Sequence, residues 1–288
     1  MDYLIHLLIL FAIYAILSLS LNLVMGYTGL LSVTHAAFFG IGAYATGILM
    51  AHAGFGFFTS LIIGIVLSGI LSFIIGAILS RLSGDYFVLG TIGLNYLVLA
   101  VFTNWYDLTR GPLGIAGIPK PSLFGVSFFQ NNYFLILSLA FLVITFFISR
   151  FIVNSSFGRA LKAIREDQKT LQVFGYNIFS YKLAIFTISG ALAAIGGSLF
   201  ASYITFINPA SFDVMQSVFI LAIVVLGGLG NLKGSLLGAL ILVAFPEFLR
   251  FIGFPSEIAA QTRQAIYGLL LVVLMLYRPQ GLIGKYKL

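Results

Sequence analysis

The chain opens with a nearly unbroken apolar run, MDYLIHLLILFAIYAILSLSLNLVMG (residues 1–26). A transmembrane helix needs about 20 predominantly apolar residues, and this run supplies them. The run has no basic residues at its start and is longer than the apolar core of a signal peptide. We therefore expect a retained first span.

Composition extends this interpretation to the whole chain. Of 288 residues, 60% are hydrophobic and 8% are charged, whereas about 25% of the residues in a soluble domain are charged. Lipid is therefore the expected solvent for most of the surface, and residues 1–288 are expected to form a single membrane-embedded domain. The net charge of +7 is typical of the positive-inside rule, so we expect membrane lipid and no nucleic acid as a partner.

Apolar segments recur along the chain and predict an all-α, polytopic transmembrane helical bundle of about nine spans, with a range of about eight to ten. Pro112, Pro119 and Pro121 break any helix in the longest connection, 106–131. The candidate spans are residues 3–25, 30–52, 57–80, 86–105, 132–149, 183–206, 214–230, 235–252 and 260–277.

Lys and Arg residues set the expected sidedness. With residues 150–182 in the cytoplasm, alternation through nine spans leaves only four of the 15 Lys and Arg outside, namely Arg110, Lys120, Arg250 and Arg263. The positive-inside rule then predicts an N-terminus outside and a C-terminus inside.

One segment between two predicted spans is strongly charged, FGRALKAIREDQKTLQVFGYN (157–177). Its apolar and charged side chains recur at helical spacing, which predicts one short amphipathic helix over 157–174, with Gly158 and Gly175 near its ends. The apolar face carries Phe157, Leu161, Ile164 and Leu171, and the charged face carries Arg159, Lys162, Glu166 and Lys169.

Three interpretations of this segment compete. It is a helix in the lipid headgroups, a solvated loop, or a helix that docks on a soluble protein. The regular apolar face argues against a plain loop. Glu166 and Asp167 beside Arg165 would weaken attraction to anionic lipid, whereas mixed charge sets register on a protein partner. The docking interpretation is therefore favoured.

The sequence lacks the usual motors and catalytic groups. No G-x-x-x-x-G-K-[ST] loop occurs, since Lys233 is followed by Gly234. All eight acidic residues lie in loops or near the ends of predicted spans, which argues against an ion-coupled relay. Cys is absent, the three His are not spaced as metal ligands, and no G-x-S-x-G occurs. We expect no metal site, no catalytic residues and no enzyme.

Two Gly-rich clusters, GYTGLLSVTH (26–35) and GGLGNLKGS (227–235), lie where predicted spans begin or end. Backbone exposed at such breaks can hydrogen-bond to a zwitterion. His35 is either a packed, satisfied side chain or part of a pathway with Ser32 and Thr34. Whether the two clusters form an inverted repeat stays open, because nine spans give them the same orientation. The predicted substrate pathway comprises Asn22, Gly26, Gly29, Ser32, Thr34, His35, Thr91 and Asn95.

Other glycines recur in small-xxx-small pairs, which predict close packing between membrane helices. These pairs are Ala36/Gly40, Ala43/Gly47, Ala193/Gly197 and Gly234/Gly238.

Six stretches, in order over most of the chain, carry a family resemblance. They are NLVMGYTGLLSVTHAAFFGIGAYA (22–45), GDYFVLGTIGL (84–94), RGPLGIAGIP (110–119), GRALKAIRED (158–167), VVLGGLGNLKGSLLGA (224–239) and YRPQGL (277–282). In these six stretches the chain resembles the LivM-type permease subunits of bacterial ABC importers for branched-chain amino acids.

The resemblance implies a translocation subunit for branched-chain or related hydrophobic amino acids in the bacterial cytoplasmic (inner) membrane. The implied partners are a second, LivH-like permease subunit, two ABC ATPase subunits and an extracytoplasmic substrate-binding protein. ATP and Mg²⁺ would bind on the ATPases, and this chain would bind no cofactor. Alternatives are the same architecture for urea, short amides or other amino acids, and an autonomous channel.

Residues 157–175 resemble the cytoplasmic segment that couples such permeases to their ATPases. The wider importer pattern places Glu-Ala-Ala before the Gly, where this chain has Lys169, Thr170 and Leu171. The coupling residues implied by the family's own motif are Gly158, Arg159, Arg165, Glu166, Asp167 and Gly175.

Overall fold

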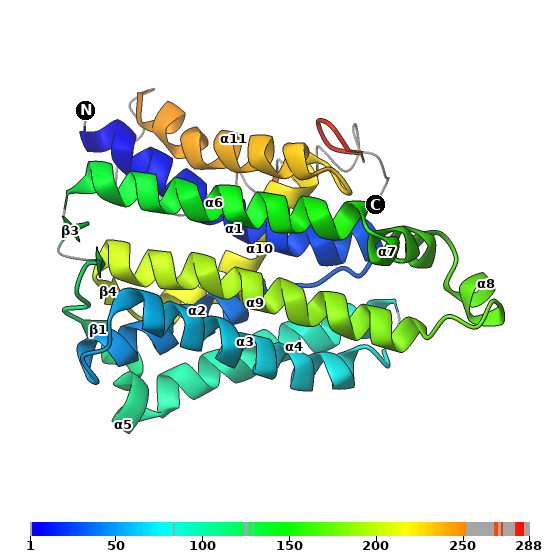
Figure 1. The fold of residues 1–288 in the computed structure, drawn as a ribbon, viewed down its shortest axis with the longest axis horizontal. Helices are drawn as coiled ribbons and strands as arrows, with labels where there is room; N and C mark the ends of the chain where they lie inside the picture. The colour runs from blue at the N-terminus through cyan, green and yellow to red at the C-terminus, as the bar shows by residue number, and fades with distance from the viewer. Residues whose placement is uncertain are drawn as a thin grey trace.

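The structure is a computed structural model that describes residues 2–82, 84–123, 126–128, 130–251, 268–269, 272 and 280–284. Its long helices run along the longest axis of the molecule and pack side by side (Figure 1). A helix satisfies its own backbone hydrogen bonds, so apolar segments of this length form helices when lipid surrounds them.

Six helical segments in the described residues are long and apolar enough to cross a membrane, and two apolar helices are shorter. The predicted all-α, polytopic fold is therefore confirmed. The ninth candidate span, 260–277, lies almost entirely outside the described residues, so the count of nine stays a prediction. The six are α1 (Asp2–Thr28), α3 (Phe57–Leu79), α4 (Asp85–Asn104), α6 (Asn131–Asn154), α9 (Ile178–Ile204) and Pro209–Gly227, which joins η2 (Pro209–Phe212) to α10 (Val214–Gly227); the shorter ones are α2 (His35–Ala51) and α11 (Leu232–Phe251, apolar to Phe245).

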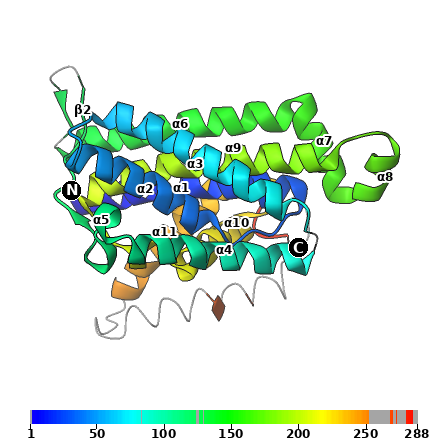
Figure 2. The same ribbon diagram turned by 90° about the horizontal axis from the view of Figure 1, so that it is seen from below.

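The two ends of the bundle carry different short elements (Figures 1 and 2). One end, here the α5 end, holds the start of α1, where His6 Nδ1 lies 2.6 Å from Tyr203 Oη. The α7 end holds α7 (Ser156–Glu166), α8 (Gln168–Val173) and residues 280–284, since Leu282 N donates to Leu226 O. The short elements of the α5 end are α5 (Tyr106–Thr109), η1 (Gly111–Leu113), β1 (Ile115–Ala116), β2 (Ser122–Leu123), β3 (Val126–Ser127) and β4 (Phe206–Ile207).

The prolines of the connection 106–131 predicted that no helix would form there, but its described residues include the short helices α5 and η1, and Pro112 lies in η1. Strand β1 of the connection pairs antiparallel with β4, with Ile115 opposite Ile207, and β2 pairs antiparallel with β3. The pairing of β1 with β4 ties this connection to the segment that follows α9.

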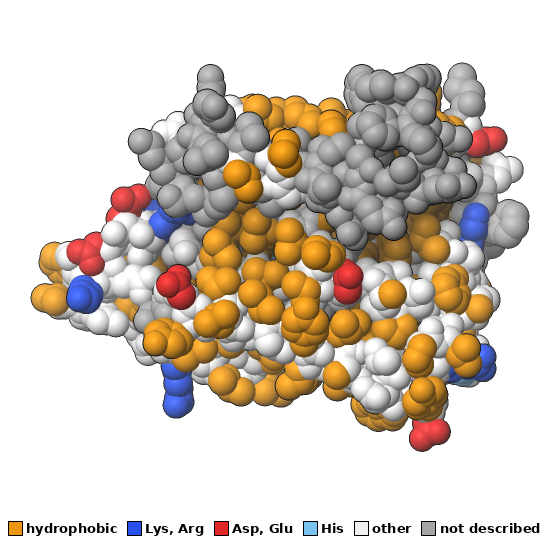
Figure 3. Space-filling view, turned by 180° about the vertical axis from the view of Figure 1, so that it is seen from behind, with side chains coloured by type: hydrophobic (Ala, Val, Ile, Leu, Met, Phe, Trp, Pro, Cys, Tyr) orange, Lys and Arg blue, Asp and Glu red, His pale blue; other side chains and the backbone are white. Residues whose placement is uncertain are grey.

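Helix α9 lies at the centre of the bundle, and 72% of its most apolar window is buried, compared with 28% for α3 and α4. The surface over the outer helices is apolar, as lipid requires: Ile62, Val66 and Leu89 are all more than half exposed. Figure 3 shows hydrophobic side chains across the middle of one face, with the visible Lys and Arg toward the two ends.

Small residues let α2 and α9 approach at backbone distance. A Cβ added at Gly197 would collide with Phe39 O and lie 2.7 Å from Ala43 N. Similarly, a Cβ at Gly238 in α11 would lie 2.9 Å from Gly227 N in α10. The sequence-based prediction of close helix packing is confirmed at Ala193/Gly197 and Gly234/Gly238.

The predicted span 30–52 is wrong at its start, because helix α2 begins only at His35. Gly29 adopts φ +74°, which turns the chain away from α1. Residues 29–34 form no helix although most of them are buried. A non-helical segment therefore enters the bundle before α2.

We expect Gly197→Leu to destabilise the protein by about 1–3 kcal/mol, because the new side chain must push α2 away from α9. Thermal unfolding of the protein in detergent measures this effect. Gly93→Leu is a matched control, since a Cβ at the exposed Gly93 of α4 meets nothing within 4 Å. Equal stability of the two variants would contradict the packing assignment.

Candidate functional site

Polar side chains gather around the start of α2, in the interior of an otherwise apolar bundle. We call the following group the α2-start cluster. It contains five residues predicted from the sequence and two that the sequence analysis missed. The members are Ser32, Thr34, His35, Thr91, Asn95, Ser189 and Ser217, all at most 1% exposed.

Three hydrogen bonds hold this cluster together across four helices. The backbone N–H of Val33 donates to Thr91 Oγ1 of α4 at 3.2 Å. His35 Nε2 lies 2.9 Å from Ser189 Oγ of α9. The backbone N–H of Ala36 donates to Ser217 Oγ of α10 at 2.9 Å. Hydroxyl groups from neighbouring helices thus replace the partners that the missing helical turn would have supplied.

Two buried polar atoms of the cluster have no hydrogen-bond partner among the described residues, His35 Nδ1 and Asn95 Nδ2. Buried polar atoms are usually paired, so each such exception requires an explanation. Helix N-termini also carry partial positive charge, which favours anions. The cluster therefore has the chemistry to meet a small polar or zwitterionic solute.

Asn22 and Gly26, also predicted for the pathway, lie in a different arrangement. Asn22 Nδ2 donates to Asn231 O at 3.0 Å and to Ser235 Oγ at 2.6 Å, and Asn22 Oδ1 accepts from Gly230 N at 3.0 Å. A Cβ at Gly26 would lie 2.6 Å from Gly230 N. The two Gly-rich clusters are thus in direct contact, in what we call the Asn22 joint between α1 and α11.

The predicted coupling segment is two helices rather than one, so the single helix over 157–174 is wrong. Asp167 breaks the helix with extended backbone angles, and its side chain accepts from Lys169 N at 2.9 Å and Thr170 N at 3.1 Å. This N-cap ends α7 and begins α8. The hydroxyl of Thr170 and these amides hold the pKa of Asp167 below its usual range.

The apolar face of the segment turns inward. Leu161 and Ile164 are completely buried, and α7 packs against α1, α6 and α9 of the same chain. A Cβ at Gly158 would collide with Ile152 O and Val153 O, so glycine lets α7 start tightly against α6. This face is already occupied and does not meet a soluble partner, contrary to the docking interpretation of the sequence.

The remaining predicted coupling residues separate into two groups. Arg159, Glu166, Asp167 and Gly175 are exposed, and Gly175 adopts φ +81° after α8. Arg165 instead points back to α1, where its Nη1 donates to Met25 O and Gly26 O.

Three hydrophobic residues at the end of α8 are exposed, which the sequence analysis missed. Val173 is 87% exposed, Phe174 74% and Tyr176 45%. We call these three residues the α8 tip; α8 projects beyond the bundle (Figures 1 and 2). The signal in the sequence is the apolar pair Val173–Phe174 near the C-terminal end of the charged segment 157–177.

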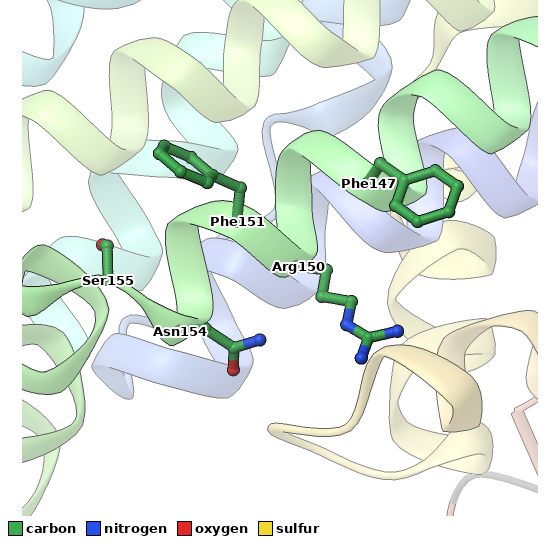
Figure 4. A pocket seen from close by; sticks show the side chains of 5 residues that line it. All are labelled: Phe147, Arg150, Phe151, Asn154 and Ser155. Carbon is green, nitrogen blue, oxygen red and sulfur yellow. The ribbon is translucent and has the colours of Figure 1, made fainter.

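A cavity of about 410 Å³ lies on the outer surface near the α7 end of α6. Its lining residues are Phe147, Arg150, Phe151, Asn154 and Ser155, and Figure 4 shows the side chains of Arg150 and Asn154 on the same side of the helix. It contains no member of the α2-start cluster.

Within the described residues, no group of three His, Cys, Asp or Glu could hold a metal ion.

Fold and site together define a polytopic α-helical membrane protein with a polar interior cluster and a helical projection at one end. Residues 3–275 match the family model of the branched-chain amino acid transport system permease component. The chain belongs to this family of membrane permeases. A permease component translocates rather than catalyses, so the prediction that the chain is not an enzyme is confirmed.

Named relatives agree with this family. The high-affinity branched-chain amino acid transport system permease protein LivM of Escherichia coli is 35% identical, over 94% of this chain and 68% of the relative. The probable LivM of Methanocaldococcus jannaschii is 30% identical, over 96% and 91%. The LivH permease of Escherichia coli is 26% identical, over 94% and 91%. No solved structure matches the chain.

We expect Asn22→Leu to destabilise the protein by at least about 1–3 kcal/mol, because it strands the buried groups of the Asn22 joint without partners. Asn95→Leu is the matched control. Asn95 Oδ1 has one long contact, 3.5 Å to Ser217 Oγ, and Nδ2 has no hydrogen-bond partner among the described residues. We therefore expect Asn95→Leu to lower the free energy of unfolding less than Asn22→Leu does. Unfolding in detergent compares the two, and an equal or larger loss at Asn95 would refute the distinction.

Proposed function

We propose that the chain is the permease subunit of an ATP-driven importer for branched-chain or related hydrophobic amino acids. The observation that carries this proposal is family membership over nearly the whole chain, with relatives named for branched-chain amino acid transport. Those names favour this cargo over urea or short amides.

In this proposal the energy comes from two ABC ATPase subunits, which bind ATP and Mg²⁺, and this chain binds no cofactor. The α8 tip is the surface that meets an ATPase. Val173 and Phe174 are exposed at the end of α8, and Glu166 and Asp167 are exposed just before its start. An aromatic anchor with a charged rim is the usual composition of a protein interface.

Sidedness follows from the charges of the two ends. Of the Lys and Arg in the described residues, only three lie at the α5 end: Arg110, Lys120 and Arg250, the last near the C-terminal end of α11. The others belong to segments of the α7 end, which is therefore the cytoplasmic end. Residue 2 lies at the α5 end and residues 280–284 lie at the α7 end, which supports the proposal of an N-terminus outside and a C-terminus inside. The basic residues of the α7 end are Arg81, Arg150, Arg159, Lys162, Arg165, Lys169, Lys182 and Lys233.

The α2-start cluster is the part of this chain that the substrate passes. The positive end of α2 and Asn95 Nδ2, which has no hydrogen-bond partner among the described residues, suit a carboxylate. A second, LivH-like permease would complete the pathway from the other side. The connection 106–131, whose described residues lie at the α5 end, and neighbouring outer loops would meet the substrate-binding protein.

Reconstitution tests the function. We expect proteoliposomes that contain the chain, its second permease, the ATPases and the binding protein to take up labelled leucine only with ATP. Leucine flux through the chain alone, without ATP, would instead support an autonomous channel. Absence of ATP-dependent uptake of leucine, isoleucine and valine by the complete complex would refute the proposed function.

We expect Phe174→Glu to weaken binding of the ATPase subunits about 30-fold or more, because it places a charge at the centre of an apolar contact. Co-purification of the ATPases with the permease measures this. Phe55→Glu is the matched control, since Phe55 is also exposed (47%) but follows α2 at the opposite end. Equal recovery of ATPase with both variants would show that the α8 tip does not dock.

A further inference from the structure

Arg165 connects the coupling segment to the first membrane helix. It lies in the last turn of α7 and is half-buried. Its Nη1 donates to Met25 O at 2.9 Å and to Gly26 O at 2.6 Å. Charge-assisted hydrogen bonds of this length are stronger than neutral ones and are directional.

The acceptors of Arg165 belong to the C-terminal end of α1. The last carbonyls of a helix carry partial negative charge, so a guanidinium there is electrostatically favoured. Met25 O also accepts from Gly29 N at 3.2 Å. Gly29 makes room for the Arg165 side chain, because a Cβ at this position would lie 3.3 Å from Arg165 Cγ. The φ of +74° at Gly29 also disfavours any side chain there.

The same end of α1 holds both polar arrangements of the interior. Ser20 O accepts from Ser189 Oγ at 2.6 Å, and Ser189 Oγ lies 2.9 Å from His35 Nε2 in the α2-start cluster. Asn22, half a turn further on, forms the Asn22 joint. The last nine residues of α1 therefore connect Arg165 with the start of α2 and with the turn between α10 and α11.

Other contacts between α7 and the bundle are less directional. Leu161 and Ile164 are buried by apolar packing, which tolerates sliding. Lys162 Nζ lies 5.7 Å from the centre of the Tyr27 ring of α1. Its hydrogen bond goes to Val153 O of α6 at 3.2 Å and does not involve the backbone of α1. Arg165 alone among these four residues makes two short hydrogen bonds to the backbone of α1.

We propose that Arg165 is a positioning residue that transmits movement of α7 and α8 to α1, and through α1 to the α2-start cluster and the Asn22 joint. The inference rests on the proposed function, because it needs an ATPase that moves the coupling segment. It differs from the sequence-based assignment of Arg165 as an ATPase contact. In this role Arg165 faces the membrane helices, and the exposed α8 tip meets the ATPase.

Uptake per ATP hydrolysed by the reconstituted complete complex tests this role, with labelled leucine as substrate. We expect Arg165→Gln to lower this ratio about tenfold, while the ATPases still co-purify with the permease. Arg165→Lys should retain an intermediate ratio, because its ammonium still donates to a carbonyl but is a single point charge. Arg150→Gln is the matched control, an exposed arginine at the same end on α6.

The outcomes separate this inference from the proposed function. A wild-type ratio in Arg165→Gln overturns the transmitting role alone, and so does loss of ATPase co-purification in that variant, which would make Arg165 a docking residue. Absence of ATP-dependent uptake by the wild-type complex overturns both. If Arg165→Gln does not fold, Arg165→Lys decides: a ratio equal to that of the wild type overturns the role, and an intermediate ratio supports it.

Discussion

Lipid offers no hydrogen bonds to a polypeptide backbone, and the interior of this protein depends on how that constraint is met at residues 29–34. The chain leaves the helical conformation there while it is still mostly buried. It can do so because hydroxyl groups of Thr91 and Ser217 accept from backbone amides of Val33 and Ala36. Each of those hydroxyls comes from a different helix, so the interruption fixes α4 and α10 around the start of α2.

Glycine supplies the second condition. A bundle with a polar interruption needs its helices close enough for short side chains such as Ser and Thr to reach across. Gly197 brings α9 to the backbone of α2, and Gly26 brings α1 to the turn before α11. Close packing and internal hydrogen bonding are therefore parts of one arrangement, in which small residues shorten the distances that hydroxyl and amide groups must span.

The coupling segment shows how one charged strip serves two surfaces. Asp167 divides it into α7, whose apolar face is buried in the bundle, and α8, which projects outward. Arg165 lies just before this division and donates hydrogen bonds to α1, and the exposed hydrophobic residues of the α8 tip lie at the far end of α8. Division at a helix cap thus separates a side that faces the membrane domain from a side that is open to a partner.

Hydropathy, span length and the order of motifs were enough to predict the membrane class, the all-α fold, the positions of most helices and the family, because these features are local to each segment and a helix needs only local contacts. Five of the eight predicted pathway residues do share one cluster. The packing of the helices was needed to show that Ser189 and Ser217 complete this cluster, that Asn22 and Gly26 lie in a separate joint, and that Arg165 faces α1. These facts depend on contacts between residues more than 100 positions apart, such as Asn22 with Gly230 and Arg165 with Met25. Periodicity along one helix does not specify which residue of another helix it will meet.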